Sequence, residues 1–234
     1  MTGRRAGQMG DYYSDHLSAD RLRRVYDIAP PRVRQYLEAE IEHVTVRTRS
    51  GDAVLELGCG YGRILPQLTT KAALVCGIDT SVANLDLGRG FLRGTGNCHL
   101  ACMNAISLGF PGHIFDRVIC IQNGISAFHV DQQALVREAV RVAKPGGLVL
   151  FSSYSDKFWN DRLDWFERQS AAGLLGEIDY EETRDGVIVC KDGFTATTVG
   201  AGRFSSLTAD LNADVRIIEV DESSLFCEIN LPAT

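Results

Sequence analysis

The sequence of 234 residues has no apolar run long enough to cross a lipid bilayer and no excess of basic side chains. Lysine and arginine together number 24 against 30 aspartates and glutamates, so the formal net charge is −6. This balance disfavours a broad phosphate-binding surface, although arginines gather between residues 21 and 49. We interpret those arginines as solvated helix faces, and we expect neither a nucleic acid nor a membrane as a partner.

The cysteine count of seven is odd, and most of the cysteines lie inside apolar runs with strand-like neighbours. They are expected to be small core side chains in a reducing compartment. Cys98, His99 and Cys102 could suggest a metal site, but no second Cys/His pair at zinc-finger spacing accompanies them, so no metal is expected. No signal-peptide core follows Arg4 and Arg5, which adds to the expectation of a cytoplasmic protein.

The most informative stretch is residues 54–63, which read VLELGCGYGR. Its apolar, β-favouring residues predict a buried strand before the glycines. Gly58, Gly60 and Gly62 permit a tight turn that a ligand can approach closely. A helix beginning near Tyr61 would then point its N-terminal N–H groups at whatever lies on the loop.

The spacing of these glycines decides between two nucleotide cofactors. A dinucleotide fingerprint reads Gly-x-Gly-x-x-Gly after the strand, whereas here the third glycine comes one residue early and Arg63 stands where the helix-packing glycine would be. NAD is therefore disfavoured. The pattern from Glu56 to Gly62 resembles motif I of the class I S-adenosylmethionine (SAM) dependent methyltransferases. Taken alone, it could equally be a tight strand-to-helix turn in an unrelated α/β protein.

A second apolar run over residues 74–78 ends at Asp79. An acidic residue about 20 positions after a glycine-rich loop is where α/β nucleotide folds place a carboxylate on the ribose hydroxyls. Ser81 is typical of a helix N-cap, and the GIDTS segment resembles motif II of the same family. The alternative is that Asp79 and Ser81 only cap that helix.

A third strand is expected over residues 98–103 and runs out at Asn104 and Ala105. In the family this position usually carries an acid that accepts a hydrogen bond from the adenine amino group. Asn104 departs from that pattern, although its side-chain carbonyl can still accept such a bond. Residues 115–121 resemble the fourth strand, and Gln122 and Asn123 follow at its carboxyl end, where open α/β sheets bind ligands.

Residues 136–151 complete the resemblance with an amphipathic helix, a Lys-Pro-Gly-Gly turn and a fifth strand. Pro145 cannot continue the helix, and Gly146 supplies the left-handed geometry of a C-terminal cap. A final helix over residues 201–211 and a closing hairpin over 215–230 are expected to follow. The resemblance implies an α/β, Rossmann-like fold: a seven-stranded, mostly parallel sheet of order 3-2-1-4-5-7-6, with the last strand antiparallel and helices on both faces.

The chain is predicted to form a single domain. Its parts would be an N-terminal tail and helical lid over residues 1–50, a SAM-binding core over 51–155, a substrate cap over 156–200, and a final helix and hairpin over 201–234. In the cap, helical spacing is expected to bury the aromatic residues and to leave Arg162 and Glu167 outside. An antiparallel hairpin should turn at Asp192 and Gly193.

The resemblance implies a SAM-dependent methyltransferase that acts on a small-molecule acceptor and releases S-adenosylhomocysteine (SAH). The implied cofactor-binding positions are Glu56, Gly58, Cys59, Gly60, Gly62, Arg63, Asp79, Thr80, Asn104, Ala105, Gln122 and Asn123. The predicted acceptor contacts are Tyr12, Tyr13, Asn123, Phe128, Tyr154 and Trp159. The two tyrosines of the tail could instead pack the lid onto the core.

Methyl transfer needs little from the protein beyond placing a nucleophile in line behind the sulfonium methyl group, since orientation can contribute about 7–11 kcal/mol. Where the acceptor must lose a proton, His129 is the first candidate base because its ordinary pKa lies near neutrality, and Tyr154 is the second. His129 could equally support the helix that begins near Asp131. No Asn-Pro-Pro-Tyr sequence follows the fourth strand, which argues against amide and adenine amino acceptors.

Two other classes of function fit the same residues. One is a SAM-binding protein without transferase activity, because a complete set of cofactor positions says nothing about turnover. The other is an NAD-type oxidoreductase on a doubly wound fold, which Arg63 and the Lys-Pro-Gly-Gly segment both argue against. The acceptor, the acceptor atom and the oligomeric state are not encoded in any motif of the sequence.

Overall fold

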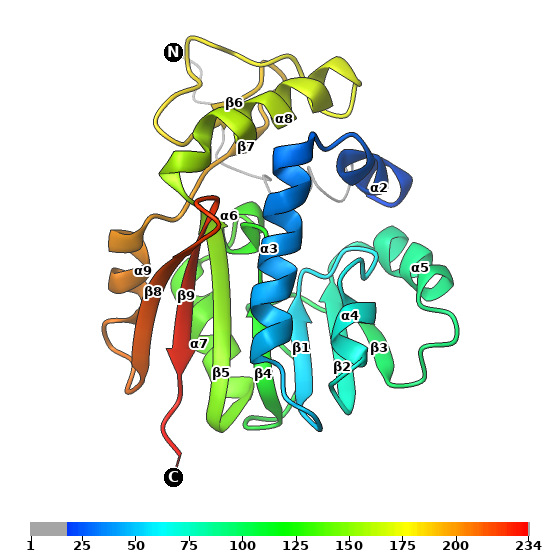
Figure 1. Cartoon of the computed structure of the whole chain (residues 1–234), viewed down its shortest axis with the longest axis vertical. Coiled ribbons are helices and arrows are strands. Elements are labelled where there is room, and N and C mark those ends of the chain that lie inside the picture. Colours follow the sequence, from blue (N-terminus) through cyan, green and yellow to red (C-terminus); the bar gives the residue numbers. More distant parts are fainter. Residues whose placement is uncertain (1–17, 234) are drawn as a thin grey trace, which may run out of the picture.

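A seven-stranded sheet forms the centre of the computed structural model, which describes residues 18–233. The strand order is β3-β2-β1-β4-β5-β9-β8 (Figure 1). The first five strands are parallel, whereas β9 runs antiparallel to both β5 and β8. The strands are β1 Ala53–Leu57, β2 Leu74–Asp79, β3 Cys98–Cys102, β4 Phe115–Cys120, β5 Ala143–Tyr154, β8 Asp214–Val220 and β9 Ser224–Asn230. The predicted fold and strand order are confirmed.

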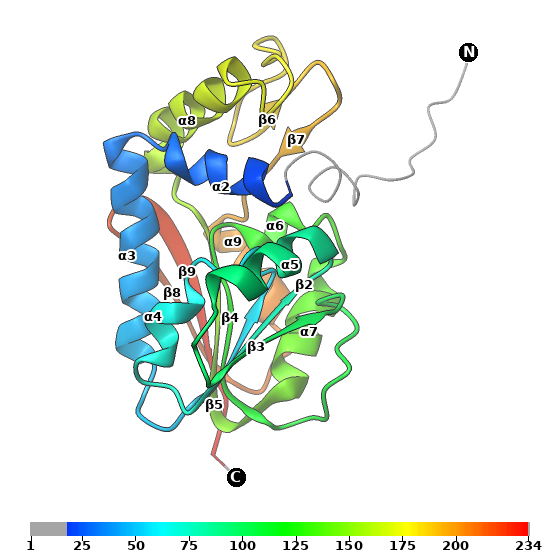
Figure 2. The same ribbon diagram turned by 90° about the vertical axis from the view of Figure 1, so that its right-hand side faces the viewer.

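Helices cover both faces of this sheet (Figures 1 and 2). The helices next to the sheet are α3 Pro31–Arg47, α4 Leu65–Thr69, α5 Val82–Phe91, α6 Gly124–Ala127, α7 Gln132–Val142 and α9 Ala201–Thr208. One apolar cluster joins α3 and α4 to the sheet through Val44, Leu65 and Phe226. A second joins α7 and α9 to the opposite face through Val136 and Phe204. Because both faces are buried, the parallel strands read as nearly continuous apolar runs.

A separate layer lies over the carboxyl ends of the parallel strands (Figures 1 and 2). It consists of α2 Asp20–Asp27, η1 Asp156–Phe158, α8 Trp159–Ala171, β6 Ile188–Val189 and β7 Thr195–Ala196. This lid-cap layer has its own apolar cluster, which includes Val25, Trp165 and Phe194. The Trp165 indole N–H donates to the Val25 carbonyl over 3.0 Å. The predicted lid and cap are therefore packed together as one unit.

The structure corrects two local expectations near the glycine loop and the fifth strand. The helix expected near Tyr61 begins only at Leu65, because Gly62 has a φ of +79° and cannot lie in a right-handed helix. At the other position, β5 begins at Ala143 directly after α7, and its register against β4 shifts between Phe115 and Arg117. Gly146 adopts the predicted left-handed conformation, with a φ of +72°, inside the bounds of this strand.

Arg162 is completely buried, which contradicts the expectation that it faces solvent. Its guanidinium donates to the carbonyls of Gly186 and Ala196 over 2.7 and 2.9 Å. It also lies 4.6 Å from the centre of the Tyr154 ring. Helical spacing identified the apolar side of α8 correctly. An arginine can nevertheless lie on such a side when carbonyl groups accept its hydrogen bonds and an aromatic ring packs against its guanidinium.

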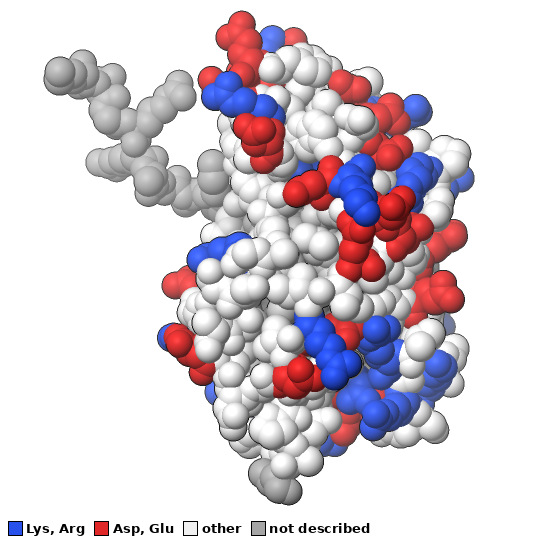
Figure 3. Space-filling model, turned by 60° about the vertical axis from the view of Figure 1, so that its left-hand side comes forward, with Lys and Arg blue, Asp and Glu red and all other residues white. Residues whose placement is uncertain are grey.

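Arginines of α3 are also more than solvated charges. Arg32 pairs with Asp221 and Arg47 with Glu228, both over 2.5 Å, so α3 is tied to the β8–β9 hairpin at two points. On the face shown in Figure 3, basic and acidic side chains are interspersed. Within residues 18–233, no helix combines the length and apolar character that a membrane span requires.

Glu40 anchors α3 to the ends of three strands. Its side chain is completely buried and accepts hydrogen bonds from the Gln122 backbone N–H and the Ser224 hydroxyl, each over 2.7 Å. The Gln122 N–H is shared with the Ser152 hydroxyl at 2.9 Å. Burial raises the pKa of the Glu40 carboxyl to about 7. The hydrogen bonds act in the opposite direction, because they stabilise the ionised carboxylate, but burial has the larger effect. Gln122 is thus held in place by a residue of α3.

We expect the anchor to make stability depend on pH. The pKa of Glu40 is raised to about 7 from an ordinary value of 4.5. Between pH 4.5 and about 7, Glu40 therefore keeps its proton in the folded state but has lost it in the unfolded state. The free energy of unfolding should therefore fall as the pH rises from about 5 to 8, and it should fall less in Glu40→Gln, which cannot ionise. Urea denaturation at several pH values measures both slopes.

Glu40→Ala provides the control for the hydrogen bonds themselves. It should lower the free energy of unfolding by about 1–3 kcal/mol for each buried donor that loses its acceptor. Equal pH slopes for the wild type and Glu40→Gln would contradict the titration of Glu40 in the folded protein.

Candidate functional site

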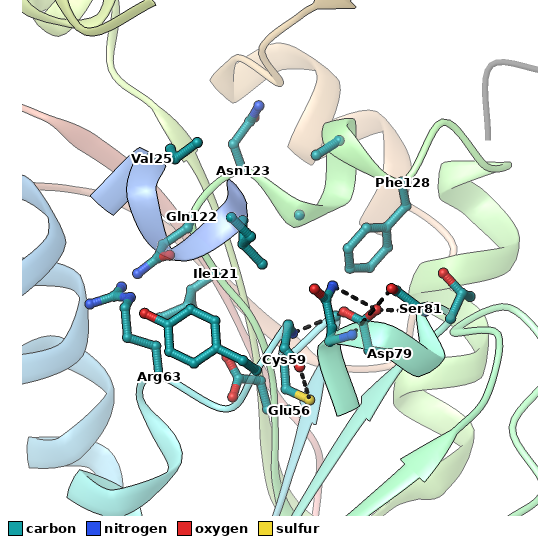
Figure 4. A pocket seen from close by; sticks show the side chains of 18 of the residues that line it. Val25, Glu56, Cys59, Arg63, Asp79, Ser81, Ile121, Gln122, Asn123 and Phe128 are labelled. Carbon is teal, nitrogen blue, oxygen red and sulfur yellow. Dashed lines mark hydrogen bonds between the residues drawn. The ribbon is translucent and has the colours of Figure 1, made fainter. Parts of the chain in front are cut away.

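A cavity of about 500 Å³ lies at the carboxyl ends of the parallel strands, under α2 and α8 (Figure 4). This volume is in the range of small-molecule sites. The sheet side is lined by Glu56, Gly58, Cys59, Gly60, Arg63, Asp79, Thr80, Asn104, Ala105, Gln122 and Asn123. The lid-cap side is lined by Leu22, Val25, Tyr26, Trp165, Phe166, Gln169, Phe194 and Ala196. Of the twelve predicted cofactor positions, all but Gly62 reach the cavity.

The glycine loop after β1 has a backbone that only glycine adopts easily. Gly58 and Gly60 have φ values of +72° and +56°. A Cβ atom at Gly58 would lie 2.3 Å from the Phe128 ring, and one at Gly60 would lie 2.9 Å from Leu22. Gly62 instead packs beneath Leu92, which places it behind the loop. A side chain at Gly58 or Gly60 would therefore collide with a residue that lines the cavity.

Asp79, at the end of β2, holds this loop in shape. Its carboxylate accepts the Gly60 N–H over 2.9 Å and the Ser81 N–H over 2.8 Å. The Asn84 side chain donates to the same carboxylate over 3.3 Å. Ser81 also caps α5, since its hydroxyl accepts the Asn84 N–H. Both interpretations of Asp79 are thus compatible, because the carboxylate lines the cavity and supports the local turn at once.

Glu56 and Arg63 lie on one side of the cavity, and Asp79 and Phe128 lie on the other (Figure 4). Glu56 is buried, and its Oε2 has no hydrogen-bond partner among the described residues. The same is true of Nε and one terminal nitrogen of Arg63. Burial raises the pKa of Glu56 to about 8, although Arg63 acts in the opposite direction.

Tyr26 of the lid closes the cavity over Arg63. The centre of its ring lies 4.4 Å from the guanidinium carbon, a cation–π arrangement. Its hydroxyl donates to the Gln122 side-chain oxygen over 3.2 Å, while the Gln122 Nε2 is buried without a partner in the described part of the chain. Within residues 18–233, Tyr26 of α2 is an aromatic residue placed against this loop. Tyr12 and Tyr13, which were predicted for this role, lie outside the described residues.

Two asparagines of the predicted site are engaged in local structure. Asn104 lines the cavity, but its side-chain oxygen accepts the Ile106 N–H over 3.1 Å. Asn123 lies in the left-handed region with a φ of +62°, accepts a hydrogen bond from Ser153 and donates to the Thr197 carbonyl. Asn123 thus fastens the segment after the cap hairpin to the ends of β4 and β5.

The two predicted bases lie differently with respect to the cavity. His129 is not among the cavity-lining residues, and burial lowers its pKa. Its neighbours Phe128 and Val130 do line the cavity, and Asp131 caps α7. Tyr154 lines the cavity, but burial raises its pKa to about 12. Trp159 lines a smaller hollow beside Tyr154 and not the main cavity.

Several cavity residues were missed from the sequence. Leu22, Val25 and Tyr26 recur at helical spacing on α2, which was the available signal for a face turned toward the core. Trp165 and Phe166 are among the cap aromatic residues that helical spacing predicts to be buried, and they line the cavity. Gln169 gave no signal, because a single glutamine in a helix usually faces water.

A family model described as a methyltransferase domain matches residues 54–147. Over these residues the chain is similar to that methyltransferase domain. The matched stretch includes the glycine loop, Asp79 and the first four strands described above. The resemblance inferred from motifs I and II is therefore confirmed.

Curated relatives of this methyltransferase domain share part of their length with it. A ubiquinone biosynthesis O-methyltransferase of Coxiella burnetii is 28% identical over 142 residues, which cover 60% of this chain and 56% of the relative. The chain thus spans about half the length of the curated relatives it matches.

Solved structures share the fold over nearly the whole chain. The N-methyltransferase NodS of Bradyrhizobium japonicum, solved with SAH, has a TM-score of 0.63 at 14% identity and covers 95% of this chain and 98% of its own. A putative SAM-dependent methyltransferase of Methanococcus maripaludis has a TM-score of 0.64 at 12% identity and covers 100% of this chain and 98% of its own.

We expect Gly58→Ala to lower the free energy of unfolding by more than the cost of its positive φ alone. A positive φ costs a non-glycine residue about 1–2 kcal/mol, and the new methyl group would also collide with Phe128. Gly51→Ala is a matched control, because Gly51 has a φ of +88° with no atom within 4 Å of the added carbon. Denaturant unfolding of both variants measures the difference.

The double variant Gly58→Ala/Phe128→Ala should recover part of the lost stability, since it removes the clash. Similar losses in Gly58→Ala and Gly51→Ala, with no recovery in the double variant, would show that Phe128 does not restrict the loop.

Proposed function

We propose that this chain transfers a methyl group from SAM to a nucleophilic nitrogen, oxygen, sulfur or carbon atom of a small molecule. The observation that carries the proposal is the set of buried polar atoms around the glycine loop. Glu56 Oε2 and two nitrogens of Arg63 are buried beside an open backbone turn, without partners among residues 18–233. Burying such atoms is costly unless a ligand binds them.

The chemistry of these atoms fits the amino-acid end of SAM. Arg63 would receive the carboxylate, and Glu56 would receive the ammonium group. Asp79, at the other side of the loop, would accept the ribose hydroxyls through the lone pairs that its bonds to Gly60 and Ser81 leave open. Thr80, Asn104 and Ala105 would border the adenine. The glycine loop supplies the close backbone approach that such a ligand needs.

Bound SAM would supply an electrophilic methyl group on its sulfonium. The contribution of the chain is then mainly to exclude water and to align the acceptor, which can contribute about 7–11 kcal/mol. The lid-cap layer does both, because α2 and α8 cover the cavity. The described residues that line the cavity include no histidine, and the raised pKa of Tyr154, about 12, keeps its phenol protonated near pH 7. We therefore assign catalysis to positioning and assign no base.

The compartment and the partner follow from the same residues. All seven cysteines are free thiols, which favours a reducing compartment, and we propose the cytoplasm. The acceptor is proposed to be a small molecule because the cavity is closed over by Tyr26, Trp165 and Phe166. The curated relative of Coxiella burnetii, named for ubiquinone biosynthesis, supports the same class of acceptor.

The direct test is transfer of an isotopically labelled methyl group from SAM to a compound in a metabolite extract. Labelled product and SAH should form with the full chain, whereas Asp79→Ala should bind SAM less tightly by about 1.5–3 kcal/mol, the range for charged hydrogen bonds. SAM binding without any labelled product would favour a SAM-binding protein without transferase activity. Failure to bind SAM or SAH in calorimetry would overturn the proposal.

We expect SAM binding to release protons through Glu56. With a pKa of about 8 in the free protein, this carboxyl is mostly protonated at pH 7, and a bound ammonium group would favour its ionised form. Affinity for SAM should therefore rise as the pH increases from 6 to 8. Calorimetry at pH 7 in two buffers of different ionisation enthalpy counts the protons released.

Glu56→Gln is the matched control, because its amide keeps the shape of the side chain but does not titrate. It should bind SAM more weakly, with fewer protons released and a flatter dependence on pH. Equal proton release by the wild type and Glu56→Gln would exclude Glu56 as the titrating group.

A further inference from the structure

Gln169 is a polar residue in an apolar position of the cap. The residues of α8 that are buried, Arg162, Trp165, Phe166 and Gln169, recur at the spacing of one helix face. Gln169 is only 3% exposed and lines the main cavity. Unlike the guanidinium of Arg162, its side-chain amide has no hydrogen-bond partner among the described residues. The amide is not among the fully buried side-chain groups without a partner, so it is open to the cavity, where a bound molecule can pair with it.

The surroundings of Gln169 are aromatic. Trp165 and Phe166 precede it on the same helix face, and their rings are 6.2 Å apart in an edge-on arrangement. Phe166 stacks on Phe194 of the hairpin at 6.2 Å, and Tyr26 lies 6.4 Å from Trp165. These rings are fixed by contacts between α2, α8 and the hairpin, so they form a preformed wall on the lid-cap side of the cavity.

Charged residues are confined to the other side of the same cavity. Among its described lining residues, the Asp, Glu, Lys and Arg side chains are Glu56, Arg63 and Asp79, and all three belong to β1, β2 or the turn after β1. No Lys, Arg, Asp or Glu of α2, α8 or the hairpin lines the cavity in the described part of the chain. A charged acceptor group would therefore be desolvated there without an opposite charge to compensate.

We propose that Gln169 is a specificity-determining residue that binds the acceptor. The acceptor is a neutral aromatic compound whose ring packs against Trp165, Phe166 and Phe194 and whose hydroxyl or carbonyl group forms a hydrogen bond with the Gln169 amide. A buried amide rejects analogues that cannot make this bond, because it would remain unpaired with them. This inference rests on the proposed function and specifies its acceptor class.

The test uses three probes of one shape: 4-ethylphenol, ethylbenzene and 4-ethylbenzoate. Calorimetry is performed on the full chain saturated with SAH. The wild type should bind 4-ethylphenol about fivefold or more tightly than ethylbenzene, as one neutral hydrogen bond implies, and more tightly than the anionic 4-ethylbenzoate. Gln169→Leu should lose the preference for the phenol without losing affinity for ethylbenzene or SAH. Gln67→Leu, an exposed glutamine of α4, is the matched control and should behave as the wild type.

The contrary outcomes separate this inference from the proposed function. If Gln169→Leu keeps the phenol preference, if 4-ethylbenzoate binds best, or if none of the probes binds to the SAH complex, the acceptor assignment is overturned while SAH binding still stands. A loss of SAH affinity in Gln169→Leu would place the glutamine in the cofactor's part of the cavity. This result would also overturn the acceptor assignment. If the leucine variant does not fold, Gln169→Glu, which keeps the length but adds a charge, should weaken phenol binding at pH 8 by about fivefold or more. Unchanged phenol binding in Gln169→Glu would likewise contradict the proposal.

Discussion

The hydrogen bond from the Gly60 N–H to the Asp79 carboxylate joins the turn after β1 to the end of β2, and the cavity depends on it. Neighbouring parallel strands end at one edge, so a carboxylate at the end of one strand can support the loop that follows the next. The bond holds the left-handed glycines in a single conformation. Glu56 lies on β1 just before this loop and Arg63 just after it, and Glu56 Oε2 and two nitrogens of Arg63 are buried without a partner among the described residues.

The lid is joined to this edge by polar groups as well as by apolar packing. Glu40 of α3 accepts the backbone N–H of Gln122, and Gln122 in turn accepts the Tyr26 hydroxyl of α2. Helices α2 and α3 thus both bind Gln122, which follows the end of β4. If α2 or α3 moved, its hydrogen bond to Gln122 would break. The position of these helices is therefore coupled to the shape of the sheet side of the cavity.

The cavity divides into two chemical environments because its two walls come from different parts of the fold. The sheet wall carries charges at the ends of strands, where backbone and side-chain donors can stabilise them. The lid-cap wall is built from the apolar faces of α2 and α8, which had to be buried in any case. A cofactor with charged groups suits the first wall and a neutral acceptor suits the second.

The sequence by itself determined the sheet order, the glycine loop, the Ser81 cap and the carboxylate at Asp79, because each depends on residues close together in the chain or on a motif shared with a family. It did not determine which side chains meet across the lid. Helical spacing marks the buried face of α8, but whether Trp159 or Trp165 borders the cavity depends on where α2 and the hairpin cover that face. Only the tertiary structure could decide that Arg162 and Gln169 are buried, since the groups that cover them lie on elements far from α8 in the sequence.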